Sequence, residues 1–292
     1  ATMDPGEEII IPEPFYANYN GFAVMSDVVI KPLTSHPEDG FALPPKEEIE
    51  KIISEKTRAF LLCNPNNPTG RVYTKEEVEM VAELAKKHNL FVIADEVYRE
   101  FIYGDVEHTS ILSVDGMEDR GIIIDSISKR YSACGSRIGC IVSKNRELMQ
   151  NILKFAQARL CPPTLDQHMA IATINLDESY FEEINVEYQK RRDIVFEELQ
   201  KIEGVLVKKP DGAFYMVVKL PVEDAEDFVK WMLTDFSVDN ETVMVAPAAG
   251  FYATPGLGND EIRIAYILNE DKLRKAMNIF AQGLKKYQEL NK

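Results

Sequence analysis

The stretch AFLLCNPNNPTG, residues 59–70, contains the pattern that decides the fold class. Its first five residues are apolar without alternation, which is typical of a strand buried on both faces of a sheet. The turn formers Asn, Pro and Gly then follow at once. The stretch therefore predicts a buried parallel strand that ends in a rigid polar turn, although such a turn on its own could be purely structural.

The same alternation of apolar runs and helical patterns extends over residues 9–143. Strands are expected at 9–11, 28–30, 59–63, 91–94, 122–124 and 138–142, and helices at 45–56 and 75–88. Helices between strands that are buried on both faces indicate crossovers in a largely parallel sheet. This half of the chain is predicted to form a doubly wound α/β layer.

The pattern changes after residue 145. Helices are expected at 147–158, 164–174, 180–202, 224–234 and 271–290, and strands at 205–207, 214–218, 243–245 and 261–267. The helix at 180–202 is long and charged, as expected of a solvated connector between domains. We predict a large domain over residues 1–175 and a smaller C-terminal α+β domain over residues 176–292, joined by a helix at about 178–203.

Composition and charge argue against two classes of function. The 292 residues include 33 Lys and Arg against 48 Asp and Glu, a formal net charge of −15. A chain this acidic repels phosphate backbones and anionic lipid, so neither a nucleic-acid nor a membrane partner is expected. The longest apolar runs also fall short of the roughly 18 residues that cross a bilayer.

The cysteines and the first residues bear on metal binding and location. The four cysteines, at 63, 134, 140 and 161, lack the spacing of a metal site, and we expect no metal and reduced thiols. The first residues have neither the basic start nor the apolar stretch of a signal peptide. A cytoplasmic location is therefore expected.

Polar side chains follow three of the expected strands where each strand ends. Asn67, Asp95 and Lys129 come after neighbouring apolar runs. Ligands of open parallel sheets bind beyond the carboxyl ends of the strands, so these groups are predicted to converge. A lysine held there among small residues tends to lose its proton and attack carbonyl carbons. Asp95 could instead cap a helix, and Lys129 could be a surface lysine.

At these residues the sequence resembles the fold-type-I, pyridoxal-phosphate-dependent aminotransferases of class I/II, and aspartate aminotransferase-like members in particular. The matching segments occur in the family's order, and they are NPNNPTG at 64–70, ADEVY at 94–98, SISK at 126–129, GSRIG at 135–139 and IRIA at 262–265. PFY at 14–16 and GAFY at 212–215 also fit. The resemblance covers essentially the whole chain and implies a mostly parallel large domain with a smaller α+β domain.

The resemblance implies roles in binding pyridoxal 5′-phosphate. Lys129 would form a Schiff base with the cofactor aldehyde and later shuttle the substrate proton. Asp95 would pair with the pyridine nitrogen and keep the ring an electron sink. Tyr98 and Asn67 would hydrogen-bond the 3-oxygen of the ring. Tyr16 would stack on the ring face, although it could also be an ordinary core aromatic.

The resemblance also implies a phosphate site and a substrate site. Ser126 and Arg137 would hold the phosphate, Arg137 with two parallel hydrogen bonds. Arg263 would bind the substrate α-carboxylate from the smaller domain, so that binding draws the domains together. Its alternative is a charge on the face of a strand. Asn67 and Phe214 would line the same site. The family often has a cis bond in its Asn-Pro-Thr-Gly turn, and Asn67-Pro68 is the candidate here.

One departure from the family concerns the start of the chain. The family carries a substantial N-terminal portion before this point, including an arm that crosses to a partner subunit and a helix whose first amides bind the phosphate. Residues 1–3 resemble the end of that helix. We therefore expect a homodimer with shared active sites, and we expect the chain alone to bind the cofactor weakly or not at all.

The implied activity is transamination between an L-amino acid, aspartate or a similar one, and a 2-oxo acid such as 2-oxoglutarate. Arg159 is the candidate for a second arginine against a side-chain carboxylate, but it could equally be a helix-end charge. Carbon–sulfur lyases and cyclopropane-carboxylate synthases use the same scaffold, because the same carbanion can react in several ways. An inactive fragment and a ligand sensor without enzymatic activity are further alternatives.

Overall fold

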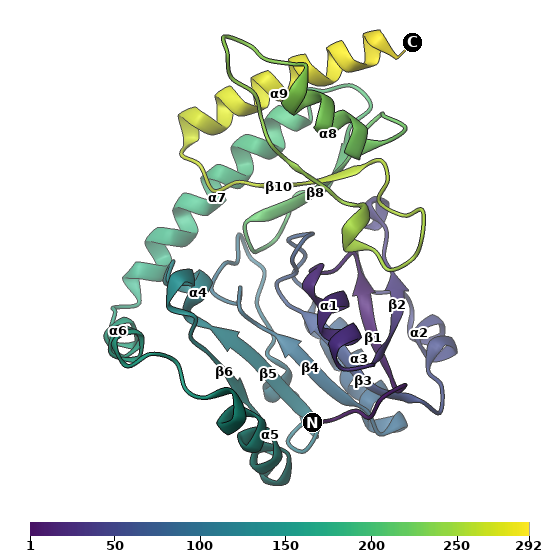
Figure 1. Cartoon of the computed structure of the whole chain (residues 1–292), viewed down its shortest axis with the longest axis vertical. Helices are drawn as coiled ribbons and strands as arrows, with labels where there is room; N and C mark the ends of the chain where they lie inside the picture. Colours follow the sequence, from purple (N-terminus) through teal and green to yellow (C-terminus); the bar gives the residue numbers. More distant parts are fainter. Residues whose placement is uncertain (292) are drawn as a thin grey trace.

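The computed structural model describes residues 1–291 and contains two sheets, which lie in two lobes stacked along the long axis of the molecule (Figure 1). The six-stranded sheet and the helices up to residue 174 form the large lobe, which is the lower one in Figure 1. The four-stranded sheet and the last three helices form the small lobe.

The large lobe is built on a sheet with the strand order β2-β1-β3-β4-β5-β6. The strands are β1 (Glu8–Glu13), β2 (Val29–Thr34), β3 (Thr57–Cys63), β4 (Phe91–Asp95), β5 (Gly121–Ser126) and β6 (Gly139–Val142). The first five are parallel, and β6 pairs with β5 in the antiparallel direction. The expected, largely parallel sheet is confirmed.

Six α-helices accompany this sheet, and they are α1 (Asn18–Met25), α2 (Lys46–Ile52), α3 (Lys75–His88), α4 (Ile127–Arg130), α5 (Arg146–Arg159) and α6 (Thr164–Ile174). The best defined is α3. Thr74 and Glu77 form a reciprocal capping box at its start, and Asn89 ends it in the left-handed conformation. Its apolar side packs into the core with Phe60 and Leu62 of β3.

The large lobe differs from the expectations in two details, the end of one helix and the presence of another. The helix expected at 45–56 ends at Ile52, because the amide of Ser54 donates to the hydroxyl of Thr57 and turns the chain into β3. Residues 1–3 lie outside the helices. Helix α1 was not predicted. The expected cis bond at Asn67-Pro68 is present.

The small lobe has an antiparallel sheet with the order β7-β8-β10-β9. Its elements are α7 (Ser179–Leu199), β7 (Leu206–Val207), β8 (Tyr215–Lys219), α8 (Ala225–Thr234), β9 (Ala246–Pro247), β10 (Glu261–Ala265) and α9 (Glu270–Leu290). The three helices lie on one side of the sheet (Figure 1). The prediction of a strand at 243–245 is wrong. Val243 and Val245 pack against the hydrophobic core of the small lobe, so their apolar character reflects this packing and not pairing with a neighbouring strand.

The two lobes share packed side chains. Tyr98, Phe101 and Tyr103 follow β4 in the chain, yet they lie in the same hydrophobic cluster as Phe214 and the helices of the small lobe. This shared core fixes the start of β8 against the end of β4. The small lobe therefore overhangs the edge of the large sheet at which β3, β4 and β5 end.

Two negative findings concern residues 1–291. In this part of the chain, no helix combines the length and the apolar character needed to cross a membrane. Over the same range, His, Cys, Asp and Glu side chains do not gather in a group of three or more that could hold a metal ion.

Candidate active site

The carboxyl ends of β3, β4 and β5 bring the predicted residues to one edge of the large sheet. These strands are adjacent and parallel, so the turn with Asn67, the last residue of β4 (Asp95) and helix α4 with Lys129 follow neighbouring strand ends. The amine of Lys129 lies 5.9 Å from the ring centres of both Tyr98 and Phe214. Phe214 directly precedes β8, so Lys129 faces the seam between the lobes.

Asp95 is held by hydrogen bonds at the end of β4. Its Oδ2 accepts from the Tyr19 hydroxyl at 2.7 Å, and its Oδ1 accepts from the Val97 amide at 3.3 Å. Burial raises the pKa of the Asp95 carboxyl above its ordinary value. A cationic N–H beside it would offset this cost, which is the chemistry of a protonated pyridine nitrogen. Sequence reasoning missed Tyr19, since α1 itself was not predicted.

Tyr98 joins the two lobes through its hydroxyl. That hydroxyl lies 3.2 Å from the hydroxyl of Tyr215, the first residue of β8, and the Tyr98 ring meets the Phe214 ring edge-on at 5.3 Å. Burial raises the pKa of the Tyr98 phenol, which therefore stays protonated near neutral pH and can donate a hydrogen bond.

Arg263 on β10 is placed to bind a carboxylate. Its guanidinium carbon lies 4.6 Å from the ring centre of Tyr215 and 4.9 Å from that of Phe251. Its Nη1 donates to Oδ1 of Asn67 at 3.0 Å, while its buried Nε has no partner among the described residues. A guanidinium fixed between two rings with a free buried donor suits a planar carboxylate. Neither aromatic contact was predicted.

The two predicted phosphate ligands lie on neighbouring segments but do not yet form a cradle. The Ser126 hydroxyl lies 2.8 Å from the Ile138 carbonyl and accepts from the Ser128 amide at 3.1 Å. Arg137, next to Ile138, is exposed, and its Nη1 donates to the Cys134 carbonyl at 3.0 Å. The backbone of Arg137 therefore lies beside Ser126, while one guanidinium nitrogen of Arg137 is engaged in a local hydrogen bond.

Tyr16 and Arg159 differ in how they relate to this edge. The Tyr16 ring meets the Tyr19 ring edge-on, with ring centres 5.6 Å apart, and the Tyr19 hydroxyl donates to Asp95. Tyr16 therefore contacts the Asp95 carboxylate only indirectly, through Tyr19. Arg159 is the exposed last residue of α5. The described contacts do not connect Arg159 with Arg263 or Lys129, and the alternative of a helix-end charge fits its position.

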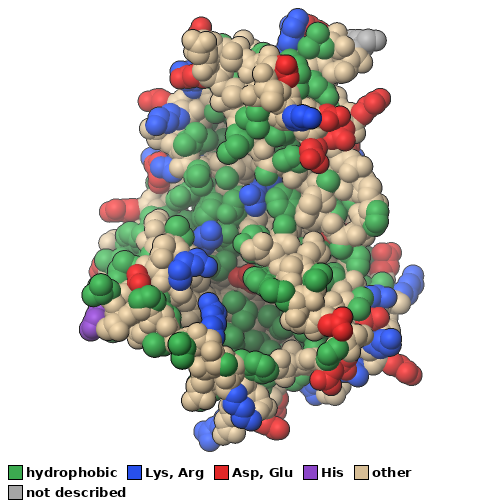
Figure 2. Space-filling model, viewed as in Figure 1, with side chains coloured by type: hydrophobic (Ala, Val, Ile, Leu, Met, Phe, Trp, Pro, Cys, Tyr) green, Lys and Arg blue, Asp and Glu red, His purple; other side chains and the backbone are tan. Residues whose placement is uncertain are grey.

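The molecule is hollowed between the lobes. Figure 2 shows hydrophobic side chains and Lys or Arg side chains in this hollow, while most Asp and Glu side chains lie nearer the outline. On this face, the visible acidic side chains lie mainly away from the hollow. A local excess of positive charge favours anionic groups such as a phosphate or a carboxylate.

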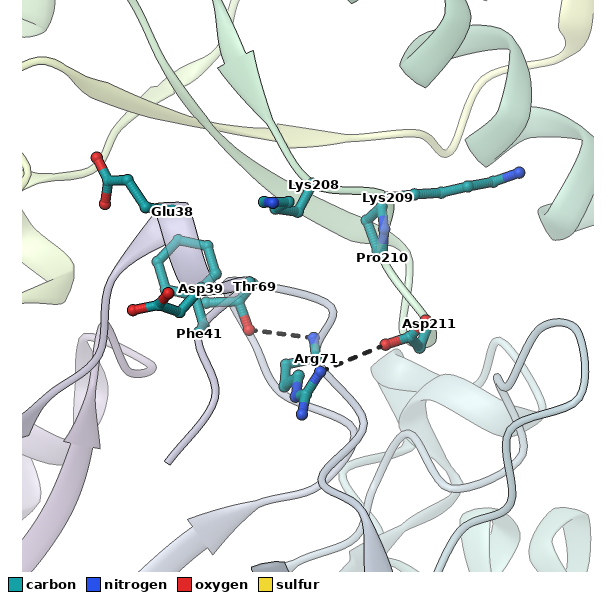
Figure 3. Close-up of a pocket in the computed structure, with 10 residues that line it drawn as sticks. Glu38, Asp39, Phe41, Thr69, Arg71, Lys208, Lys209, Pro210 and Asp211 are labelled. Carbon is teal, nitrogen blue, oxygen red and sulfur yellow. Dashed lines mark hydrogen bonds and ion pairs between the residues drawn. The ribbon is translucent and has the colours of Figure 1, made fainter. Parts of the chain in front are cut away.

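A separate cavity of about 310 Å³ lies beside the turn with Asn67 rather than at Lys129 (Figure 3). Arg71 in its wall is 3.0 Å from Glu77 and 3.9 Å from Asp211, which comes from the loop before β8. The cavity lies between the lobes, and its lining does not include Lys129, Asp95 or Arg263, so it is separate from the candidate site.

Comparison with known proteins places the whole chain in one group. The sequence profile of the family "Aminotransferase class I and II" matches residues 1–280. An aspartate aminotransferase of Pyrococcus abyssi is 32% identical over 283 residues, which are 95% of this chain and 70% of that protein. An aromatic-amino-acid aminotransferase of Thermococcus litoralis is 31% identical over 288 residues, which are 97% of this chain and 71% of that protein.

Solved structures agree with this result. The aromatic aminotransferase of Pyrococcus horikoshii superposes with a TM-score of 0.87 at 32% identity, covering 98% of this chain and 75% of that one. The aspartate aminotransferase of Thermotoga maritima superposes with a TM-score of 0.86 at 30% identity, covering 97% of this chain and 71% of that one.

Proposed function

Since this chain belongs to the aminotransferase class I and II family, we propose that Lys129, Asp95 and Arg263 are the residues that carry its activity. The activity of the family is pyridoxal-phosphate-dependent transamination between an amino acid and a 2-oxo acid. When bound, pyridoxal 5′-phosphate supplies an electron sink for negative charge at the substrate Cα. The single observation behind the assignment is the convergence of an amine, a half-buried acid and an arginine held between rings at one sheet edge.

Lys129 is the proposed base. Its amine would hold the cofactor covalently and, once free, take the proton from the substrate Cα and return it. The rings of Tyr98 and Phe214, whose centres are 5.3 Å apart, border the amine on one side. A fixed wall of this kind helps to hold the base near one reacting atom, and such positioning raises the rate of the step.

Asp95 and Tyr98 are the proposed partners of the cofactor ring. The Asp95 carboxylate would bind the ring nitrogen, and Tyr19 would keep that carboxylate oriented. Tyr98 and Asn67 would donate to the 3-oxygen, and Tyr16 would cover the ring face. Ser126 and Arg137 would bind the phosphate, and the bond from Nη1 of Arg137 to the Cys134 carbonyl leaves its other guanidinium nitrogens for that role.

Arg263 is the proposed ligand of the substrate α-carboxylate, with Asn67 and Phe214 beside it. Its free buried Nε supports this role, because a carboxylate would satisfy a donor that otherwise lacks a partner. We propose aspartate or a similar amino acid as donor and 2-oxoglutarate as acceptor, in line with the relative named as an aspartate aminotransferase.

An aromatic amino acid is a second candidate donor. The site is lined by the rings of Tyr98, Phe214, Tyr215 and Phe251. One relative is named as an aromatic-amino-acid aminotransferase. Rates with aspartate and with phenylalanine, each with 2-oxoglutarate, separate the two, and the donor with the higher kcat/KM identifies the side-chain pocket.

We further propose that the chain forms a homodimer with shared active sites and that it is located in the cytoplasm. We also propose that the boundary between its two domains lies between residues 175 and 176. Exposed apolar side chains on α5 and α6 support an association surface, because a monomer rarely exposes so many together. They include Leu153, Phe155, Leu165, Ile171 and Ile174. Sedimentation equilibrium tests the assembly, and a strictly monomeric chain with full activity would contradict it.

The experiment on the proposed base compares Lys129→Ala with Lys144→Ala, an exposed lysine outside the site. The amount of 2-oxo acid formed from the donor should depend on the acceptor in wild type and in Lys144→Ala, and should fall by about 10²–10⁴-fold in Lys129→Ala. Ammonia or thiol release without an acceptor would indicate a lyase instead. Wild-type turnover by Lys129→Ala would remove Lys129 from the proposal.

A further inference from the structure

Helix α4, which carries Lys129, is a single turn that cannot be stable by itself. It spans four residues, Ile127–Arg130, and a helix this short does not recover the cost of its nucleation. The Ser126 side chain caps its start by accepting from the Ser128 amide at 3.1 Å. The cap fixes the residue at which the helical turn begins. A second contact is needed to fix the rotation of the turn about its own axis.

The second anchor is Arg130, at the end of the turn. Its Nη2 donates to both carboxylate oxygens of Asp125, at 2.9 and 2.8 Å, and its Nη1 lies 3.7 Å from Glu100. The side chains of Arg130 and Asp125 are only 11% and 10% exposed, so solvent screens this pair weakly. Asp125 is the penultimate residue of β5, and the contact therefore ties α4 back to the sheet.

Arg99 extends the pair into a four-residue charge network. It lies 3.5 Å from Asp125, and its Nε donates to Glu100 at 3.2 Å. Arg99 and Glu100 follow β4, whereas Asp125 and Arg130 belong to β5 and α4. The network thus spans the ends of the two strands that supply Asp95 and Lys129.

We propose that Arg130 is a positioning residue that directs the Lys129 amine into the site. Consecutive residues of a helix point about 100° apart, so a grip on Arg130 fixes the direction of Lys129. Arg130 points to the charge network, while Lys129 points to Tyr98 and Phe214. The inference rests on the proposed role of Lys129.

Arginine is required because its two terminal nitrogens reach two carboxylates. One of them bridges both oxygens of Asp125 and the other faces Glu100. A lysine carries one compact charged group and could satisfy only one of these partners. Removing the charge altogether leaves the largely buried Asp125 carboxylate with the Ser126 amide at 2.7 Å and, as its one remaining cationic partner among the described residues, Arg99 at 3.5 Å.

The test measures where pyridoxal 5′-phosphate reacts with the chain. The cofactor is incubated with wild type, Arg130→Lys and Arg130→Met, and each sample is then reduced with borohydride and digested. Mass spectrometry gives the rate at which the cofactor labels Lys129, relative to its rate of labelling the other lysines. Every variant is measured well below its thermal midpoint, so that the folded fraction does not differ. Arg274→Met, which removes an exposed ion pair with Glu198 in the small lobe, is the matched control.

We expect the relative rate at Lys129 to fall about tenfold or more in Arg130→Met, because a displacement of about 1 Å can cost up to a hundredfold. Arg130→Lys should lie between Arg130→Met and wild type, and Arg274→Met should match wild type. The fall should appear at every pH, with an unchanged pH midpoint for the labelling of Lys129. A shifted midpoint with an unchanged plateau would mean that Arg130 acts by charge and not by position.

A double variant covers the case in which Arg130→Met does not fold. Asp125→Asn with Arg130→Met removes both charges and leaves no unpaired carboxylate, a change that buried ion pairs often tolerate. It should also label Lys129 slowly. Wild-type labelling in this double variant or in Arg130→Met overturns the inference. If wild type itself shows no preference for Lys129, the proposed site fails together with the inference.

Discussion

The two halves of the candidate site are constructed differently. In the first half, which we call the β4 half, Asn67, Tyr98 and Arg263 are held by groups from both lobes, and Asn67 and Tyr98 are only 5% and 3% exposed. In the second, the β5 half, Lys129 lies on a one-turn helix, Arg137 is exposed, and all four residues of β6 are exposed.

This difference shows which interactions fix the positions of the side chains in each half of the site. The hydrophobic core of the chain builds the β4 half, so its geometry is present before any ligand binds. The β5 half depends on local hydrogen bonds and on the charge network of Arg99, Glu100, Asp125 and Arg130. We therefore expect changes in the β4 half to alter catalysis or stability strongly, and changes on the outer surface of the β5 half to alter stability little.

The largest effect is expected for Asp95→Asn. The amide cannot stabilise a protonated pyridine nitrogen, so kcat should fall by about 10²–10³, as when one electrostatic partner of a transition state is removed. Steady-state transamination with saturating cofactor measures this change. Activity within twofold of wild type would show that Asp95 does not face the ring.

The same variant should change stability in the opposite direction. Burial raises the pKa of Asp95, so the folded state binds this proton more tightly than the unfolded state. The ionised carboxylate therefore costs stability above its folded-state pKa, and the cost disappears as the pH falls through that value. Without cofactor, Asp95→Asn should melt above wild type at neutral pH and approach it in acid, which thermal unfolding at several pH values can check.

Glu13 tests the joint between the lobes. It is fully buried, and its Oε2 accepts from the amides of Ala253 and Thr254 at 2.8 and 3.1 Å, while Thr34 donates to its Oε1 at 2.8 Å. Glu13→Ala leaves these donors unpaired and should lower the free energy of unfolding by about 3 kcal/mol or more.

Urea unfolding measures the effect of the Glu13 change. Glu13→Gln, which keeps one acceptor for the two amides, should lose less stability than Glu13→Ala. Equal losses in the two variants would mean that the volume of the side chain matters more than its hydrogen bonds.

Tyr19→Phe should have a moderate effect that is visible mainly in the pH dependence. The Tyr19 hydroxyl stabilises the ionised form of Asp95, so its removal raises the pKa of Asp95 further. The acid limb of kcat/KM should therefore move to higher pH, while the plateau changes little. A lower plateau with an unmoved acid limb would instead point to a packing role for Tyr19.

The smallest effect on the folded chain is expected on the surface of the β5 half. Phe155 on α5 is 64% exposed, so Phe155→Ser should change the free energy of unfolding of the monomer by only about 0.5 kcal/mol. Sedimentation equilibrium of the same variant should show weaker association if this face binds a second copy. A decrease of several kcal/mol in the free energy of unfolding of the monomer would contradict the expectation that surface changes in the β5 half alter stability little.

The sequence predicted those features that depend on local pattern. The apolar runs and the polar residues that follow them were enough for most elements other than α1 and β9, for the mostly parallel sheet and for the position of Asp95, Asn67 and Lys129 at neighbouring strand ends. The family, the cofactor and transamination as the activity are likewise confirmed by the comparisons.

What the sequence did not predict depends on tertiary contacts. Helix α1 has Gly21 at its centre and no clear apolar stripe, so the hydrogen bond from Tyr19 to Asp95 could not be expected. The rings around Arg263 come from segments that meet only after folding. The pairing of Arg130 with Asp125 joins residues five apart, and pattern alone does not distinguish it from two separate surface charges.

The central claim is that Lys129 and Asp95 hold the two ends of one pyridoxal 5′-phosphate molecule. A crystal structure of the chain grown with a large excess of this cofactor, which offsets weak binding, tests the claim most directly. We predict a covalent bond between the Lys129 amine and the former aldehyde carbon, and a hydrogen bond from the ring nitrogen to Asp95. A cofactor attached to another lysine, or a ring nitrogen that points away from Asp95, would contradict the account.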